Sequence, residues 1–387
     1  MSYARSRLLL GMLGVGLLVL TSFYCLIKQV PLKWLPGTEV WSGSDLIALA
    51  TVFGGLITIL LPLDLLGGYL LPNRAGPKPI LWRRFVIGWV RGVGFQGCFF
   101  LLASLLILAL GRWQGLLAVS CGIIALGFLL IAFQLKLGGL IGGFQQVTGL
   151  STSDRDRMDA ATRQTVAWGW KPRDLILLTH QDPGFTGGVV GIPGFEKVVV
   201  PDTALLRLSS DELAATLARR FEAIEDGSRA RGILVAFFWV VLGFNLSAFL
   251  PGAGVTSVGG LAMTCLGFTL WTFIGLLTLP TLSRQASFAI DKRVLARGVA
   301  PESLHRSVRK FDELQDDEPE RPAVIEAIFH PVPSVIRRQG QTETGPPLAW
   351  HVARMTLFLS WACMGTLARA VHCNVGRPEL WVMYPSD

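Results

Sequence analysis

The residue types that most often carry enzymatic chemistry are few in this chain and poorly spaced for it. The five histidines are His180, His305, His330, His351 and His372. No two of them lie four apart or at another spacing usual for a shared zinc ion. Five of the six cysteines lie inside apolar runs, namely Cys25, Cys98, Cys121, Cys265 and Cys363, and no C-x-x-C pair occurs. The sequence therefore predicts no zinc ribbon, no redox dithiol and no disulfides.

One predicted helix gathers both charge and an apolar stripe. Ser209 and Glu212 form the S-x-x-E pattern that caps a helix start. The helix that follows, from Asp211 to Asp226, carries its apolar stripe at Leu213, Leu217, Phe221 and Ile224. Its helical register is therefore set locally, before any tertiary contact is considered.

The same helix carries Arg219, Arg220 and Glu222. A guanidinium group stays protonated and has no lone pair to give to a metal ion. Arg219 and Glu222 are three apart, which predicts an exposed ion pair worth about 0.2–0.5 kcal/mol. A second hypothesis is that the arginines line a groove that holds an acidic peptide or the chain's own Glu225, Asp226 or Asp291.

The elements that must position these residues are largely lipid-embedded. The 387 residues are 51% hydrophobic and only 16% charged, whereas a soluble domain has about 25% charged residues. Most of the apolar sequence lies in long runs, so membrane spans rather than soluble domains are predicted. The net charge of +8 is explained by basic residues in short loops between spans, and we expect no nucleic-acid partner.

Four spans are predicted in the first third of the chain. They are Leu8 to Ile27, Leu46 to Leu63 with a possible extension to Pro72, Gly92 to Gly111, and Trp113 to Leu135. The first run is too long for a signal peptide and lacks a cleavage site, so we interpret it as a helix that is retained. Arg5, Arg7 and the loop with Arg74, Lys78, Arg83 and Arg84 place the N-terminus and that loop in the cytoplasm.

Arg91, inside the third apolar run, has two interpretations. It marks a transport pathway, because intramembrane charge is often functional, or its side chain extends to the cytoplasmic side. The first interpretation is the only residue-level support for a channel or carrier.

The remaining chain alternates between polar and apolar stretches. Gly232 to Leu282 has no charged residue and is broken near Pro251, which predicts a transmembrane hairpin. Polar sequence with predicted strands at Leu175 to Leu178 and Lys197 to Val200 precedes it, and polar sequence with a helix starting at Pro301 follows it. Met355 to Ala368 is short enough to be a buried, interfacial or re-entrant helix as readily as a span.

The predicted domains are residues 1–143 with four spans, 144–231 as the first part of a soluble domain, the hairpin 232–282, the second part 283–346, and a C-terminal apolar segment and tail 347–387. The fold class is an integral membrane α-helical bundle of about six transmembrane helices with a small α+β domain interrupted by a helical hairpin. The side of the membrane on which the tail from Cys373 lies is left open.

The segment VVVPDTALLRLSSDELAATLARRFEAIEDG resembles the region around the active-site helix of HtpX-like membrane zinc peptidases, the family that includes the prenyl-protein proteases. The apolar hairpin, the stretch SRQASFAID after it and HPVPSVIRR beginning at His330 follow in the family's order. The resemblance covers about residues 144 to 340. It implies a metallopeptidase-like fold in the soluble part.

The resemblance also implies that the metal site is lost. The family binds zinc through H-E-x-x-H on this helix, and those positions match Arg219, Arg220 and Ala223. The third ligand, a glutamate after the hairpin, matches Ser287, and the aspartate four residues later is kept as Asp291. We therefore expect no catalytic residues, no metal ligand and no cofactor, and we expect His330 to end a structural element before Pro331.

These observations predict a catalytically inactive membrane-embedded metallopeptidase homologue, a pseudoenzyme that acts as a scaffold or as a regulatory or protein-binding subunit. The alternative is an active membrane zinc endopeptidase with non-standard ligands, acting in membrane-protein quality control. Expected partners are the lipid bilayer and another membrane protein or peptide segment. The expected location is the cell inner membrane, multi-pass, with the peptidase-like domain in the cytoplasm.

Overall fold

The computed structural model of the protein describes residues 2–76, 79–180, 182, 184–315, 317–340 and 349–382. Lys78 of the basic loop and the predicted domain boundary at 346 lie outside them. Contacts divide the chain into two compact units. The first, residues 1–130, 236–275 and 356–382, is called the membrane unit, and the second, chiefly residues 131–235 and 276–355, is called the sheet unit.

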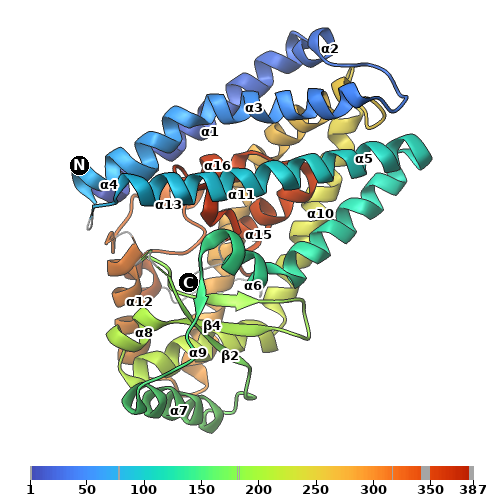
Figure 1. Cartoon of the computed structure of the whole chain (residues 1–387). Helices are drawn as coiled ribbons and strands as arrows, with labels where there is room; N and C mark the ends of the chain where they lie inside the picture. The colour runs from blue at the N-terminus through green and yellow to red at the C-terminus, as the bar shows by residue number, and fades with distance from the viewer. Residues whose placement is uncertain are drawn as a thin grey trace. The chain divides into compact units, whose positions relative to one another are not determined.

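Five described helices are long and apolar enough to cross a membrane (Figure 1). They are α1 (Tyr3–Ile27), α3 (Gly43–Leu65, continued by η1, Leu66–Leu70, and α4, Leu71–Ala75), α5 (Trp82–Ala132), α10 (Ser228–Ala248) and α11 (Val258–Ala296). A short α2 (Val30–Trp34) follows α1. The protein is therefore a multi-pass membrane protein, as the apolar runs predict.

The helix α5 is broken near its middle. Its 51 residues would extend about 77 Å if straight, more than twice the hydrocarbon thickness of about 30 Å. Gln114 and Gly115 leave the helical region, and Gly115 has φ of +69°, a conformation that costs a glycine little. The break falls beside Arg112, where the sequence predicts the end of one span. The count of six crossings stays a prediction.

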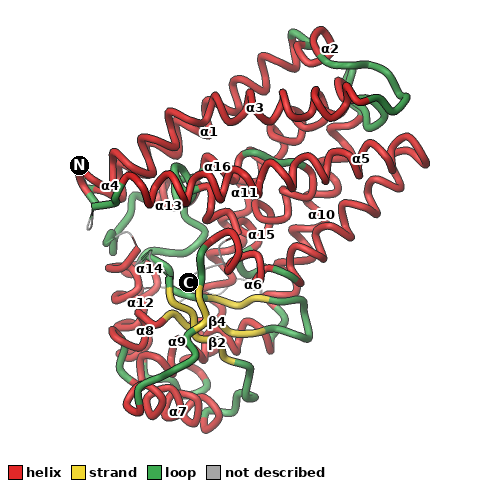
Figure 2. The backbone as a smooth tube through the Cα atoms, in the orientation of Figure 1, coloured by secondary structure: helices red, strands yellow, loops and turns green. Residues whose placement is uncertain are grey.

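The sheet unit contains a four-stranded mixed sheet (Figure 2). Its strands are β1 (Gln145–Gln146), β2 (Leu175–Thr179), β3 (Gly188–Val190) and β4 (Lys197–Pro201), in the order β1-β2-β4-β3. The two central strands, β2 and β4, are parallel, and β1 and β3 add antiparallel edges. Both strands predicted from sequence are confirmed, and they form the centre of the sheet because their buried β-branched residues suit it.

The sheet unit contains α9 (Ser210–Glu225) together with further helices. The others are α6 (Gln134–Leu137), η2 (Gly138–Gly142), α7 (Thr152–Ala167), α8 (Asp202–Arg207), α12 (Pro301–Gln315), α13 (Ala323–Phe329) and α14 (Val335–Gly340). The predicted capping box of Ser209 and Glu212 is formed in both directions. Leu213, Leu217 and Phe221 are buried in the main core of this unit, which α7 and α12 help to close.

The C-terminal region forms only short elements. They are α15 (Val352–Leu359), η3 (Ser360–Cys363), α16 (Leu367–Ala370) and η4 (Pro378–Val382). The apolar helix from Val352 to Cys363 would be about 18 Å long, too short for a bilayer crossing. The open question about Met355 to Ala368 is answered in favour of a short, buried helix.

Candidate functional site

The helices α9 and α11 bring the sequence-predicted site residues of the sheet unit together. Arg219, Arg220 and Ala223 lie on α9, and Ser287 and Asp291 lie on the last part of α11. The capping box fixes the start of α9, and its apolar stripe fixes the face that points to the core. Two of the five residues, Arg219 and Asp291, bind each other directly.

Asp291 is held between two guanidinium groups. Arg219 Nε donates to Asp291 Oδ1 at 2.6 Å. Arg338, from α14, donates to both oxygens of the carboxylate at 2.7 and 2.8 Å. Both arginine side chains are 3–4% exposed. We name these three residues the cationic corner, because two buried positive charges face one negative charge.

Arg220 is fully buried and donates hydrogen bonds to two backbone carbonyls. Its Nη1 donates to Val199 O at 2.8 Å and its Nη2 to Thr186 O at 2.6 Å. These bonds connect α9 to β4 and to the residue that precedes Gly187. A guanidinium with this role supplies positive charge and donors, and it cannot accept a proton as a general base would.

Ala223 and Ser287 complete the matched positions without adding a ligand. Ala223 is fully buried, and Ser287 Oγ donates to Ser283 O of its own helix at 3.2 Å. Among the described residues, no group of three or more His, Cys, Asp or Glu side chains could hold a metal ion. Two guanidinium groups, a methyl group and a hydroxyl do not fit zinc, which binds imidazole, thiolate and carboxylate ligands.

Three of the histidines make contacts within the sheet unit. His330 is the residue at which α13 ends, as predicted, and its carbonyl accepts a hydrogen bond from Arg284 at 3.2 Å. His180 stacks on Phe144 with ring centroids 4.1 Å apart. His351 packs against Trp350.

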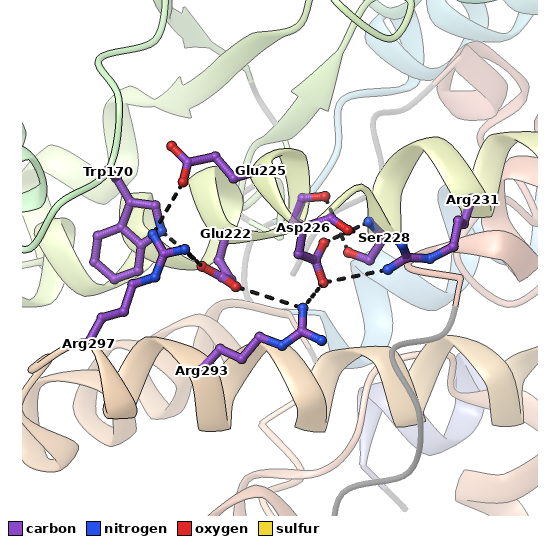
Figure 3. A network of polar contacts seen from close by, with 9 residues as sticks. Trp170, Glu222, Glu225, Asp226, Ser228, Arg231, Arg293 and Arg297 are labelled. Atoms are coloured by element: carbon purple, nitrogen blue, oxygen red, sulfur yellow. Dashed lines mark hydrogen bonds and ion pairs between the residues drawn. The ribbon is translucent and has the colours of Figure 1, made fainter.

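An ion-pair network that the sequence did not predict joins α9 to α11 (Figure 3). Glu222 lies 3.2 Å from Arg297 and 3.8 Å from Arg293, and it accepts a hydrogen bond from Trp170 at 3.0 Å. Asp226 binds Arg293, and Arg297 also pairs with Glu225 at 3.2 Å. The network fixes the C-terminal end of α9 against the last turns of α11.

This network corrects one expectation. The prediction of an exposed pair of Arg219 with Glu222 is wrong, because both side chains are buried and face α11, where Arg219 binds Asp291 and Glu222 lies 3.8 Å from Arg293. The signal was present in the spacing: Glu222 and Asp226 are four apart, as are Arg293 and Arg297, so each pair presents two charges on one helix face. The interpretation in which Arg219 holds the chain's own Asp291 agrees with the structure.

Glu212 is the one acidic residue near the start of α9 that has three partners. It binds the backbone N–H of Ser209, Lys310 at 2.7 Å and Arg306 at 3.2 Å. Burial alone would raise the pKa of this carboxyl, but its bonds to Lys310 and Ser209 outweigh burial and lower the pKa from its ordinary value.

Comparison with known proteins finds a solved structure with a similar fold. No family model matches the sequence, and none of the curated proteins matches it. Among solved structures, the chain is similar to the crystal structure of S. mikatae Ste24p, a membrane zinc metallopeptidase. The superposition has a TM-score of 0.59 at 12% sequence identity and covers 78% of this chain and 75% of Ste24p.

The chain has a membrane-metallopeptidase-like fold. At 12% identity the likeness concerns the fold alone. It supports the predicted resemblance in its general form, a multi-pass helical protein with a metallopeptidase-like architecture. The finer statements, a relation to HtpX and a lost active site, remain proposals.

Proposed function

We propose that the protein is a catalytically silent relative of the membrane zinc metallopeptidases and that it acts by binding, as a scaffold, decoy or regulatory subunit. The observation that carries the proposal is the pairing of Asp291 with both Arg219 and Arg338. In this arrangement Arg219 stands at the position that the resemblance gives to the first metal ligand, and Arg338 brings a second guanidinium group to the same aspartate. A divalent cation would meet permanent positive charge there.

The position that the family resemblance gives to the general base also lacks a proton acceptor. Arg220 stands at that position, and it donates hydrogen bonds to the carbonyls of Val199 and Thr186. Arginine keeps its proton at any pH at which a protein is folded. Arg220 therefore cannot activate a water molecule from this position.

The burial of the corner supports a structural use of these charges. Removing one member of a buried ion pair costs about 3–5 kcal/mol, because the remaining charge is left in a medium that solvates it poorly. The cationic corner therefore holds α9, α11 and α14 together in the way that a bound metal would hold its ligands. A fold so stabilised keeps its binding surfaces without the metal.

We further propose that the partners are the lipid bilayer and another membrane protein or peptide segment. The proposed location is the cell inner membrane, with the sheet unit in the cytoplasm. Arg74, Arg83 and Arg84 support this orientation, because basic residues concentrate in cytoplasmic loops.

The experiment that tests the proposal rebuilds the family's ligand set in one variant. It combines Arg219→His, Arg220→Glu, Ala223→His and Ser287→Glu. We expect the detergent-purified variant to bind about one zinc ion per chain, measured by mass spectrometry of the metal content. The matched control keeps Ala223 and carries the other three changes, so it lacks one imidazole and binds zinc more weakly.

Two outcomes would contradict the proposal. A folded four-residue variant that takes up no more zinc than its control would mean that the corner is not equivalent to a metal site. Cleavage of a peptide by the unmodified protein that stops when a chelator is added would favour the alternative, an active zinc endopeptidase with non-standard ligands. The second measurement does not depend on whether the rebuilt variant folds.

A further inference from the structure

The strands β3 and β4 of the sheet unit are joined by a short loop with exposed apolar residues. We call this loop, residues 191–196, the hairpin tip. Its sequence is GIPGFE, in which Pro193, Gly194 and Phe195 are exposed, Phe195 by 76%. One exposed apolar side chain is ordinary on a protein surface. The rigidity of the hairpin tip and its place on the sheet unit are not.

The hairpin tip is a preformed turn. Phe195 N donates to Ile192 O at 3.0 Å, which closes a four-residue β-turn. Pro193 occupies the second position, and Gly194 occupies the third with φ of +91°, as in a type II turn. Gly191 has φ of +94°, and a Cβ there would lie 2.6 Å from Phe195 O. The main chain therefore presents Phe195 in a fixed conformation, so little entropy is lost when its side chain is covered.

The backbone donors of the exposed tip residues are satisfied inside the turn. Pro193 has no N–H, Gly194 N donates to Glu196 Oε2 at 2.9 Å, and Phe195 N donates to Ile192 O. An unsatisfied N–H is costly at the edge of a hydrocarbon phase, so this arrangement suits contact with lipid. A turn that bound a protein strand by main-chain pairing would need free donors instead.

The charges next to the hairpin tip are paired and buried. Glu196 lies 3.7 Å from Arg229 of α10, and the two side chains are 5% and 4% exposed. Arg229 Nη2 also donates to Gly191 O at 2.5 Å. These contacts attach both ends of the hairpin tip to the first turn of α10. The exposed part of the tip, residues 193–195, is uncharged.

This attachment sets the height of the hairpin tip relative to the bilayer. Arg229 precedes by three residues the uncharged run that begins at Gly232, a distance of about 4.5 Å along a helix. Leu234, early in that run, is 69% exposed, as a side chain that faces lipid is. Headgroups form a layer of about 5–8 Å on each side of the hydrocarbon core. Arg229 therefore lies at headgroup depth, and the hairpin tip that it binds lies at a similar depth.

The opposite end of the sheet is attached near the exit of another membrane helix. His180 directly follows β2, and its Nε2 lies 3.1 Å from Gly142 O. Gly142 ends the helical stretch that continues from α5, and it lies about 9 Å along a helix beyond Lys136. The strands therefore run between the ends of two membrane helices. Their direction follows the bilayer surface, which keeps the hairpin tip near it.

We propose that the hairpin tip is a lipid-binding element that inserts Phe195 into the boundary between headgroups and acyl chains beside α10, and so fixes the sheet unit on the membrane surface. Apolar and aromatic side chains of interfacial elements bury about 5–10 Å into this boundary. Lys197, exposed on the strand that leaves the tip, adds a positive charge that attracts anionic headgroups. The partner is the bilayer itself. The proposal does not depend on whether the cationic corner excludes a metal.

The test measures the depth of position 195 in the full chain. Phe195→Cys is made in a variant whose six native cysteines are replaced by alanine, labelled with a nitroxide and reconstituted into phosphatidylcholine vesicles. Electron paramagnetic resonance compares collisions of the label with oxygen, which concentrates in lipid, and with a water-soluble nickel chelate. Two matched controls carry the label at Leu234, exposed on α10, and at Asp156, exposed on the charged helix α7.

We expect the ratio of oxygen to nickel collisions at position 195 to lie nearer to that at Leu234 than to that at Asp156. A ratio nearer to that at Asp156 would show that the hairpin tip is in water and would overturn the proposal. Few collisions with either reagent would show that protein covers the tip, a partner or a second copy, and would also overturn it.

A second measurement leaves the native cysteines in place. Phe195 is replaced by the photoreactive analogue p-benzoyl-phenylalanine, the protein is irradiated in the same vesicles, and adducts are identified by mass spectrometry. We expect a phospholipid adduct on the peptide that contains the hairpin tip and only background with the analogue at Asp156. Phe195→Ser should leave the Tm in detergent unchanged, because the side chain is exposed. Background adduct at the tip, or an adduct to a protein chain in place of lipid, would overturn the proposal.

Discussion

The cationic corner of the sheet unit and the Asp64 site of the membrane unit both bury an aspartate, but they balance its charge differently. Asp291 has two arginine partners, Arg219 and Arg338. Asp64 has one arginine, Arg369, and a neutral indole donor, Trp89. Asp64 is therefore bound by one guanidinium group, whereas Asp291 is bound by two.

The difference indicates what each site is suited to hold. An aspartate bound by one arginine and one indole is a structural anchor that favours one arrangement of its neighbours. An aspartate that lies between two guanidinium groups has positive charge on two sides, which disfavours a further cation. The predictions below alter one site and use the other as its comparison, beginning with the largest expected effect.

Replacement of Asp291 by alanine is expected to have the largest effect on stability. The change removes the carboxylate that two buried guanidinium groups share, and like charges then face each other. The expected loss is at the upper end of about 3–5 kcal/mol, seen as a lower Tm or as failure to accumulate. The triple change Arg219→Met, Asp291→Leu, Arg338→Met should recover much of it, since apolar groups can replace a buried ion pair. A loss below about 1 kcal/mol for Asp291→Ala would mean that the corner is open to water.

Replacement of Asp64 by alanine should cost somewhat less, about 3 kcal/mol. Arg369 keeps its bond to Gln96 in this variant, so the remaining charge is partly satisfied. Thermal unfolding in detergent checks the value against Leu61→Ala, an exposed position of the same helix. A larger loss of stability for Asp64→Ala than for Asp291→Ala would contradict the prediction that an aspartate with two arginine partners contributes more than an aspartate with one.

Replacement of Arg220 by methionine removes two hydrogen-bond donors from the core of the sheet unit. Val199 O and Thr186 O each lose a hydrogen bond, and we expect a loss of about 2 kcal/mol. Chemical denaturation measures it, with Arg220→Lys as a variant that restores one bond and part of the loss. An unchanged midpoint for Arg220→Met would show that these carbonyls find other donors.

Replacement of Glu222 by glutamine probes the network of Figure 3. Its partners Arg293 and Arg297 are about one-third exposed, so solvent and salt screen them, and we expect a loss of about 1 kcal/mol. The loss should shrink between 0.05 and about 0.5 M salt, unlike that of Asp291→Ala. Equal salt dependence in the two variants would contradict the difference in burial.

The smallest effect is the pH dependence that Glu212 contributes. Its pKa lies below the ordinary value of 4.5, so the folded protein binds this proton less readily than the unfolded chain does. Its stabilisation is fully present above that ordinary value and is lost as the pH falls through the lowered pKa. The Tm difference between the wild type and Glu212→Gln should therefore narrow as the pH falls below 4.5. A difference that stays constant down to pH 3 would mean that Glu212 acts by shape and not by charge.

Local features were predictable from sequence because their causes are local. The capping box at Ser209, the strands β2 and β4 and the break of the hairpin near Pro251 each follow from a few neighbouring residues. The same holds for His330 at the end of α13. Each of these is decided by backbone preference and hydrophobic pattern.

Long-range partners were not predictable in the same way. Arg338 lies 47 residues beyond Asp291, and no periodicity connects them. The exposed pair of Arg219 and Glu222 was wrong because helical spacing gives the distance between two side chains but not their burial. The burial of residues 366–382 was not predicted, because it depends on close contacts with glycines of three helices that are distant in the sequence.

The zinc content of the unmodified protein tests most directly whether the cationic corner excludes a metal ion. The full chain is purified in detergent after growth with added zinc and without chelators, and metal and protein are quantified in the same sample. With Arg219 and Arg338 bound to Asp291, the account predicts less than about 0.1 zinc ion per chain, whereas an intact catalytic site would hold about one. A zinc content near one ion per chain would contradict this prediction. So would an experimental density map in which Arg219 and Asp291 do not form an ion pair.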